Sequence, residues 1–126
     1  FIPTAERGIL LHQLLSIARF LIRRCDANGD IKGWIDKNQY SPTCGKELNI
    51  HTINLYQLTD VLLKPATAVR QSSYVELVAE SVEAQRPDWF VSHWWGEPIF
   101  HFIVCIQHFS SKRGGRSVFW VCAYAN

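Results

Sequence analysis

The sequence predicts an α/β protein in which helices come first and a strand–helix–strand unit of a parallel sheet follows. Three observations carry this prediction. Apolar residues recur at helical spacing between residues 5 and 25, and two short apolar runs lie at 89–91 and 118–123. An apolar-faced helix is predicted between those two runs. Continuous apolar runs on both sides of a helix are typical of parallel strands that are buried on both faces.

The composition is that of a folded domain without an obvious polyanionic or lipid partner. Of the 126 residues, 48% are hydrophobic and 19% charged, which is enough apolar material for a core. The net charge of +2 is scattered along the chain, so it gives no reason to expect nucleic acid as a partner. No apolar stretch reaches the ~20 residues that a membrane span needs. We therefore expect no nucleic acid and no membrane among the partners.

The cysteines indicate the compartment. Four are present, none of them in a CxxC pair, and no signal peptide opens the chain: Cys25, Cys44, Cys105 and Cys122. Reduced thiols of a cytoplasmic protein are the main expectation, with disulfides as the alternative.

Residues 1–86 are predicted to form a helical N-terminal extension with a polar loop at 26–51. The first helix is placed over residues 5–25 and capped by Thr4. Its apolar stripe consists of Leu10, Leu14, Ile17 and Leu21. Within the polar loop, residues 33–36 are a candidate arm of a small hairpin.

Two further helices have capping signals. Asn54 with Gln57 resembles a capping box, and this helix is predicted to end at Lys64-Pro65. Ser73 with Glu76 is a second such signal. In this second helix Glu76, Glu80 and Glu83 are predicted to share a solvent-exposed face.

Residues 87–126 are predicted to form the first βαβ unit of a parallel sheet. Trp89-Phe90-Val91 is expected to be a buried strand, and Pro98 marks the start of the next helix. The turn at 110–115 leads to a second buried strand at 118–123. The buried helical face consists of Ile99, Phe102, Ile103, Ile106 and Phe109. Because the chain ends directly after a core strand, we expect a sheet truncated at the C-terminus and a protein that continues beyond Asn126.

The leading candidate site is the turn between this first strand and the helix. Its residues are Ser92, His93, Trp94, Trp95, Gly96 and Glu97. A loop after a parallel strand lies at the carboxyl edge of the sheet, where ligands usually bind, and the following helix directs free N–H groups to the same place. The tryptophans offer stacking faces, and Glu97 offers a base or a ribose ligand. In the alternative interpretation both tryptophans pack into the core and Glu97 only favours the helix dipole.

Three other groups of residues give weaker evidence for a functional site. A helical stripe of zinc-type residues comprises Glu97, His101, Cys105 and His108, but it lies opposite the apolar face, so no metal site is predicted. Residues 26–30 imitate the start of a calcium loop, but the sixth and twelfth positions of such a loop, which require glycine and glutamate, hold Ile31 and Lys37. Cys122 with His93 is a candidate nucleophile pair, although Cys122 lies in an apolar run that is typical of a buried thiol.

Two segments resemble a known family. Residues 89–97 and 119–126 are similar to the opening blocks of the fungal heterokaryon-incompatibility domain, "LSYxWGD" and "WIDALCINQ". Ser92, Trp95, Gly96 and Glu97 match the first block, with glutamate in place of aspartate, and Trp120 and Asn126 match the second. That family is related to Toll/interleukin-receptor-like domains. The same segments are also similar to proteins of unicellular algae.

The resemblance implies a flavodoxin-like parallel sheet and a role in signalling. It also implies that Asn126 joins residues 92–97 in a pocket for NAD or another nucleotide, with no other cofactor. Any NAD-cleaving activity would need a glutamate on a later helix, beyond Asn126, so the chain is not catalytically complete as it stands. The alternative is a non-enzymatic module that self-associates through its aromatic turn and open strand edges.

Overall fold

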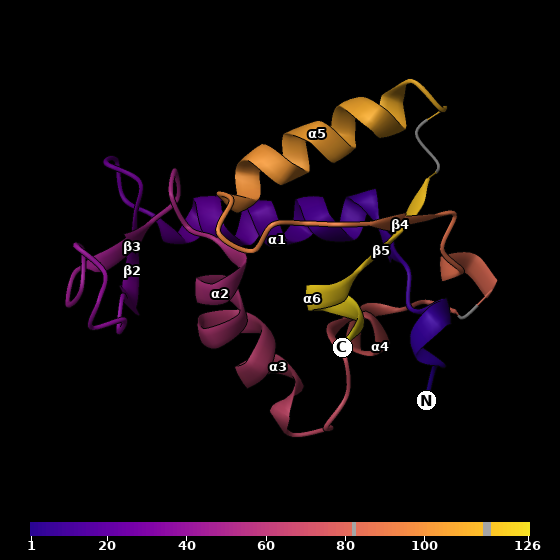
Figure 1. The fold of residues 1–126 in the computed structure, drawn as a ribbon, viewed down its shortest axis with the longest axis horizontal. Coiled ribbons are helices and arrows are strands. Elements are labelled where there is room, and N and C mark those ends of the chain that lie inside the picture. The colour runs from indigo at the N-terminus through magenta and orange to yellow at the C-terminus, as the bar shows by residue number, and fades with distance from the viewer. Residues whose placement is uncertain (82, 115–116) are drawn as a thin grey trace.

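A computed structural model describes residues 1–81, 83–114 and 117–126. It contains a three-stranded sheet, a separate two-stranded hairpin and helices packed around them (Figure 1). The hairpin lies at one end of the molecule, away from both termini. No helix in the described ranges is both long and apolar enough to cross a membrane.

The first helix is shorter than predicted. After a 3-10 turn at Thr4–Glu6, residues Ile9–Leu10 form strand β1, and α1 spans Leu11–Arg24. β1 pairs antiparallel with the last strand of the sheet, so its backbone groups are used there and the helix begins only afterwards. The Gln13 side chain accepts a hydrogen bond from the Leu10 N–H and starts α1 in place of the predicted cap at Thr4.

The polar loop contains the hairpin that residues 33–36 indicated. Strand β2 spans Asp30–Ile35 and pairs antiparallel with β3, Glu47–Asn49. Asp36 organises the connecting loop, because its carboxylate accepts hydrogen bonds from the Asn38 N–H (3.0 Å) and the Thr43 hydroxyl (2.7 Å). The part of the chain before residue 87 is therefore not helical throughout.

The second helical segment is longer than predicted. The Asn54–Gln57 capping box is confirmed at the start of α2, Leu55–Leu58, which continues into a π-helix at Thr59–Leu63 and then α3 at Lys64–Ala68. The prediction that Lys64-Pro65 ends the helix is wrong. In the π-turn the Lys64 N–H bonds to the Thr59 carbonyl five residues back, and Pro65 starts the next helical turn, where its missing N–H is tolerated.

The second capping box is also confirmed, at Ser73 and Glu76, but the helix that it starts is short. α4 spans Tyr74–Val78 and is followed by a 3-10 turn at Glu83–Gln85. Glu80 and Glu83 therefore lie outside α4 and do not share a helical face with Glu76. Glu76 turns inward instead, 3.4 Å from the guanidinium of Arg7.

The C-terminal part is a parallel βαβ unit, as predicted. β4 (Trp89–Val91) is followed by α5 (Ile99–Ser111) and by β5 (Val118–Val121), which is parallel to β4. Pro98 immediately precedes α5, and the five residues predicted for its inner face pack inward. Ser110 and Ser111 belong to α5 rather than to the predicted turn, and Gly115 lies outside the described residues.

Two expectations about these strands are wrong. The sheet order is β1-β5-β4, which leaves β4 at an edge, so Trp89 and Phe90 are 43% and 68% exposed rather than buried. The predicted strand at 118–123 ends at Val121, because its partner β4 ends opposite that residue at Val91. Cys122–Ala125 then form the short helix α6, which places Tyr124 against Tyr74 of α4.

One hydrophobic core joins the two halves of the chain. α1 and α5 pack against each other (Figure 1), and the core includes Leu14, Leu21, Leu55, Ile99 and Phe119. The sheet itself is mixed, since β1 runs antiparallel to β5 and β4 runs parallel to it.

Candidate functional site

The 92–97 turn leaves β4 and is held in place by the segment that precedes α2. The Leu55 N–H donates to the Trp95 carbonyl (3.0 Å), and the Ile99 N–H donates to the Ile53 carbonyl (2.9 Å). The turn closes on itself through the Glu97 N–H and the Trp94 carbonyl (3.0 Å). One of the N–H groups at the start of α5 is therefore already occupied by protein, whereas the sequence predicted free N–H groups directed at a ligand.

His93 is the buried polar residue of this turn. Its side chain is 2% exposed and its ring stacks on Phe102, with centroids 3.8 Å apart and planes 7° apart. Neither ring nitrogen has a hydrogen-bond partner among the described residues. Burial lowers the pKa of His93 from 6.5 to about 4, so the ring is neutral at pH 7. Although Glu97 lies 3.8 Å from Nε2, the two residues form no ion pair at that pH.

The two tryptophans of the turn have different environments, so the alternative interpretation in which both pack into the core is wrong. Trp95 is half-buried against Tyr56, with ring centroids 5.4 Å apart. Trp94 is 74% exposed, and its indole lies over Gly96, where a Cβ atom would be 2.7 Å from the ring. Gly96 is thus required for the position of Trp94.

Three of the predicted site residues line one hollow of about 470 Å³, which we call the turn hollow. Its lining consists of Phe90, Val91, Ser92, His93, Trp95, Trp120 and Cys122. Phe90 and Trp120 form an aromatic pair with centroids 5.6 Å apart. The hollow is therefore lined by both members of the candidate pair His93 and Cys122 and by two aromatic rings from the paired strands. Cys122 is exposed, so the expectation of a buried thiol is wrong.

The other predicted residues lie elsewhere. Trp94, Gly96 and Glu97 do not line the turn hollow. Asn126 follows α6 rather than a strand, and it lines a different hollow together with Arg7 and Glu76. Its side-chain amide contacts Cys122 Sγ at 2.9 Å. Asn126 is therefore not among the residues that line the turn hollow, although it contacts Cys122, which is.

The metal-type residues do not converge. His101, Cys105 and His108 are exposed on α5, and no group of three potential ligands gathers within the described ranges. The Asp26 carboxylate is used locally, since it accepts hydrogen bonds from the N–H groups of Asn28 (2.8 Å) and Asp30 (3.0 Å). All four cysteines are free thiols, with Cys25 partly buried and the others exposed.

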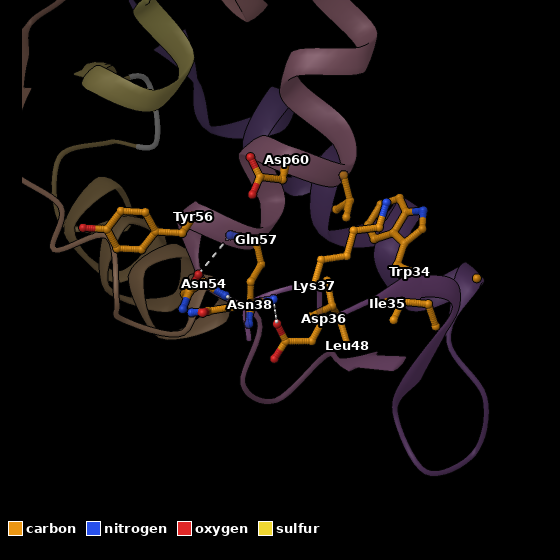
Figure 2. A pocket seen from close by; sticks show the side chains of 12 residues that line it. Trp34, Ile35, Asp36, Lys37, Asn38, Leu48, Asn54, Tyr56, Gln57 and Asp60 are labelled. Atoms are coloured by element: carbon orange, nitrogen blue, oxygen red, sulfur yellow. Dashed lines mark hydrogen bonds between the residues drawn. The ribbon is translucent and has the colours of Figure 1, made fainter. Parts of the chain in front are cut away.

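A larger hollow, of about 830 Å³, was not predicted from the sequence. It lies between the β2–β3 hairpin and the segment of α2 and the π-helix (Figure 2), and we call it the hairpin hollow. Its lining includes Trp34, Asp36, Asn54, Tyr56, Gln57 and Asp60. The capping box marked Asn54 and Gln57 as a helix start, but no local signal showed that the hairpin would fold against it.

Comparison of the chain with family models, with curated proteins and with solved structures finds no match.

Proposed function

We propose that the chain is a signalling-type domain whose turn hollow binds a small aromatic ligand of the nucleotide type, with NAD and ADP-ribose as first candidates. The observation that carries the proposal is that both ring nitrogens of the buried His93 lack a hydrogen-bond partner among the described residues. A buried donor or acceptor without a partner costs about 1–3 kcal/mol. Both nitrogens are buried, so a ligand group that displaces the 92–97 turn enough to hydrogen-bond to this imidazole would recover that cost, and His93 lines the hollow.

The aromatic lining supports a flat ligand. Phe90 is 68% exposed and lies beside Trp120, while Trp95 completes another part of the lining. Exposed rings beside a hollow can stack on a base at a gain of about 1–3 kcal/mol per ring. We expect the aromatic ring of the ligand, and not its phosphates, to make the main contacts. The Ile99 N–H at the start of α5, which could have bound a phosphate, already donates to the Ile53 carbonyl.

No catalytic role is proposed for these residues. Glu97, the carboxylate of the turn, lies outside the lining of the turn hollow. The proposed activity of this segment is binding.

The test is a titration with NAD, ADP-ribose and adenosine, followed by tryptophan fluorescence. All proteins carry Trp94→Phe, which removes an exposed indole outside the hollow and leaves Trp95 and Trp120 as local reporters. We expect saturable quenching, weakened about tenfold by His93→Phe, because phenylalanine keeps the stacking on Phe102 but loses both nitrogens.

The matched control is His101→Phe, the same change at an exposed position of α5. It is expected to leave the titration unchanged. Absence of saturable quenching in a folded chain, or equal affinity in the parent and His93→Phe proteins, would refute the proposal.

One observation favours self-association as a second candidate. Trp89, Phe90 and Trp94 are 43%, 68% and 74% exposed along the edge strand β4 and its turn. An exposed aromatic strand edge is a template for pairing with another chain. In this reading sedimentation shows concentration-dependent association that Trp94→Ala abolishes and Tyr40→Ala, at an 86% exposed ring on the hairpin loop, does not. A chain that stays monomeric at all concentrations argues against it.

A further inference from the structure

The hairpin hollow has the size of a small-molecule site. Its volume of about 830 Å³ lies within the range of about 300–1,000 Å³ that is usual for ligand pockets. Figure 2 shows side chains from two elements around it, Trp34 and Asp36 from the hairpin region and Asn54, Gln57 and Asp60 from the helical segment. The π-helix forms part of this wall through Asp60, and π-turns inside helices are frequent at functional sites.

The capping box presents hydrogen-bond donors to this hollow. The Asn54 Oδ1 accepts from the Gln57 N–H, and the Gln57 Oε1 accepts from the Asn54 N–H, both at 3.0 Å. Each side chain is thereby held by its oxygen. The two NH₂ groups make no hydrogen bond within the part of the chain that the structure describes, so they are oriented donors available to a ligand.

The two carboxylates of the hollow differ in how far they are occupied, since among the described residues only one oxygen of Asp60 has a partner. Both oxygens of Asp36 already accept hydrogen bonds, and bonds from Ser41, Thr43 and Asn38 hold the pKa of this carboxyl below its usual value. Asp60 lies 3.5 Å from Lys64 on the helix surface. The lining thus offers free hydrogen-bond donors. Its charged side chains are the carboxylates of Asp36 and Asp60 and the ammonium group of Lys37, which together carry a net negative charge. A ligand that presents acceptors without negative charge is favoured.

The remaining walls are apolar. Trp34 is only 9% exposed and is held from outside by the Arg24 guanidinium, 4.9 Å from the ring centroid. Ile35, Leu48 and Val61 add aliphatic surface. Such walls suit the C–H face of a ring whose edge carries hydroxyl groups.

From these features we propose that the hairpin hollow binds a neutral, hydroxyl-rich ring, either a free sugar or the ribose of a nucleoside. The hydroxyl oxygens accept from the amides of Asn54 and Gln57, and the ring lies against the apolar walls. This site is separate from the turn hollow and does not depend on the function proposed for it, although Tyr56 at its rim contacts Trp95.

The experiment is a titration of the ¹⁵N-labelled full chain with D-ribose, D-glucose and adenosine, observed by NMR. We expect saturable shifts of the side-chain amide signals of Asn54 and Gln57. The variant Gln57→Glu keeps an oxygen for the Asn54 N–H, since glutamate is the usual partner in a capping box, but it removes the free donor. Its affinity is expected to fall about tenfold.

Gln107→Glu, the same change at an exposed position of α5, is the matched control and should leave the affinity unchanged. Shifts with the two sugars support a saccharide site, and shifts at the same amides with adenosine alone support a nucleoside site. The proposal is overturned if these amide signals do not shift with any probe, or if Gln57→Glu binds as the parent does. Adenosine shifts confined to the indole of Trp95 would also overturn it, while leaving the turn hollow as the ligand site.

Discussion

At the scale of single residues, His93 couples the stability of the fold to pH. In the unfolded chain its imidazole has an ordinary pKa of about 6.5, whereas burial lowers the folded value to about 4. Between these two values the unfolded state binds more protons than the folded state. The free energy of unfolding is therefore complete above pH 6.5 and falls as the pH drops toward 4.

We predict a loss of roughly 3 kcal/mol between pH 6.5 and pH 4 from this residue. Urea unfolding at half-unit steps of pH measures it. The variant His93→Leu should lack most of this dependence, because it has no group to protonate in either state. The other four histidines are exposed, so a variant with the same slope as the parent would show that burial of His93 is not the cause.

At the scale of elements, capping side chains decide where the helices begin. The capping boxes at Asn54 and Ser73 set the starts of α2 and α4. At the start of α1 the Gln13 side chain accepts from the Leu10 N–H, but Leu10 has no polar side chain that could accept in return. In the long helical segment the π-turn then shifts the hydrogen-bond register before Pro65. The same turn places Asp60 in the wall of the hairpin hollow.

Removal of the cap at Asn54 tests this account of the element. Asn54→Ala is expected to destabilise the chain by about 1 kcal/mol, because the Gln57 N–H loses its acceptor. Asn54→Asp keeps an acceptor oxygen and should lie close to the parent. Chemical denaturation of the three proteins makes the comparison, and equal losses in both variants would assign the effect to something other than the cap.

At the scale of the whole molecule, the N-terminal segment joins parts of the chain that are distant in sequence. The buried Arg7 donates to the carbonyls of Ile2 (2.6 Å) and Ala125 (2.9 Å) and lies 3.4 Å from Glu76. A hydrogen bond from the Ser73 N–H, together with that from Ile2 and the charge of Arg7, holds the pKa of Glu76 below its usual value. The network connects both termini to α4.

Arg7→Met is expected to cost about 3 kcal/mol, because it removes the guanidinium beside the nearly buried Glu76 carboxylate and leaves two carbonyls without their donor. Arg19→Met is the matched control, since Arg19 is exposed on α1 and, among the residues that the structure describes, makes only a 3.5 Å contact with Ser16. The control should change stability by less than about 0.5 kcal/mol. If urea unfolding gives similar losses for the two variants, the network does not hold the molecule together.

Much of the local structure could be predicted because its causes are local. The capping boxes, the inner face of α5 and the parallel pairing of the strands on either side of it follow from residue spacing alone. The candidate site was predicted in part. Ser92, His93 and Trp95 share one hollow as adjacent residues of a turn, whereas Asn126 belongs to a different region.

Local residue patterns were enough to predict the α/β class, the helix starts with side-chain caps and the aromatic turn, since each depends on residues close together along the chain. Three features became visible only in the folded chain: residues 9 and 10 form a strand, β4 is an exposed edge, and the hairpin encloses a hollow with α2. These features depend on contacts between distant segments. Ile9 pairs with Phe119 and Trp34 lies across from Asn54, and no local pattern encodes such a meeting.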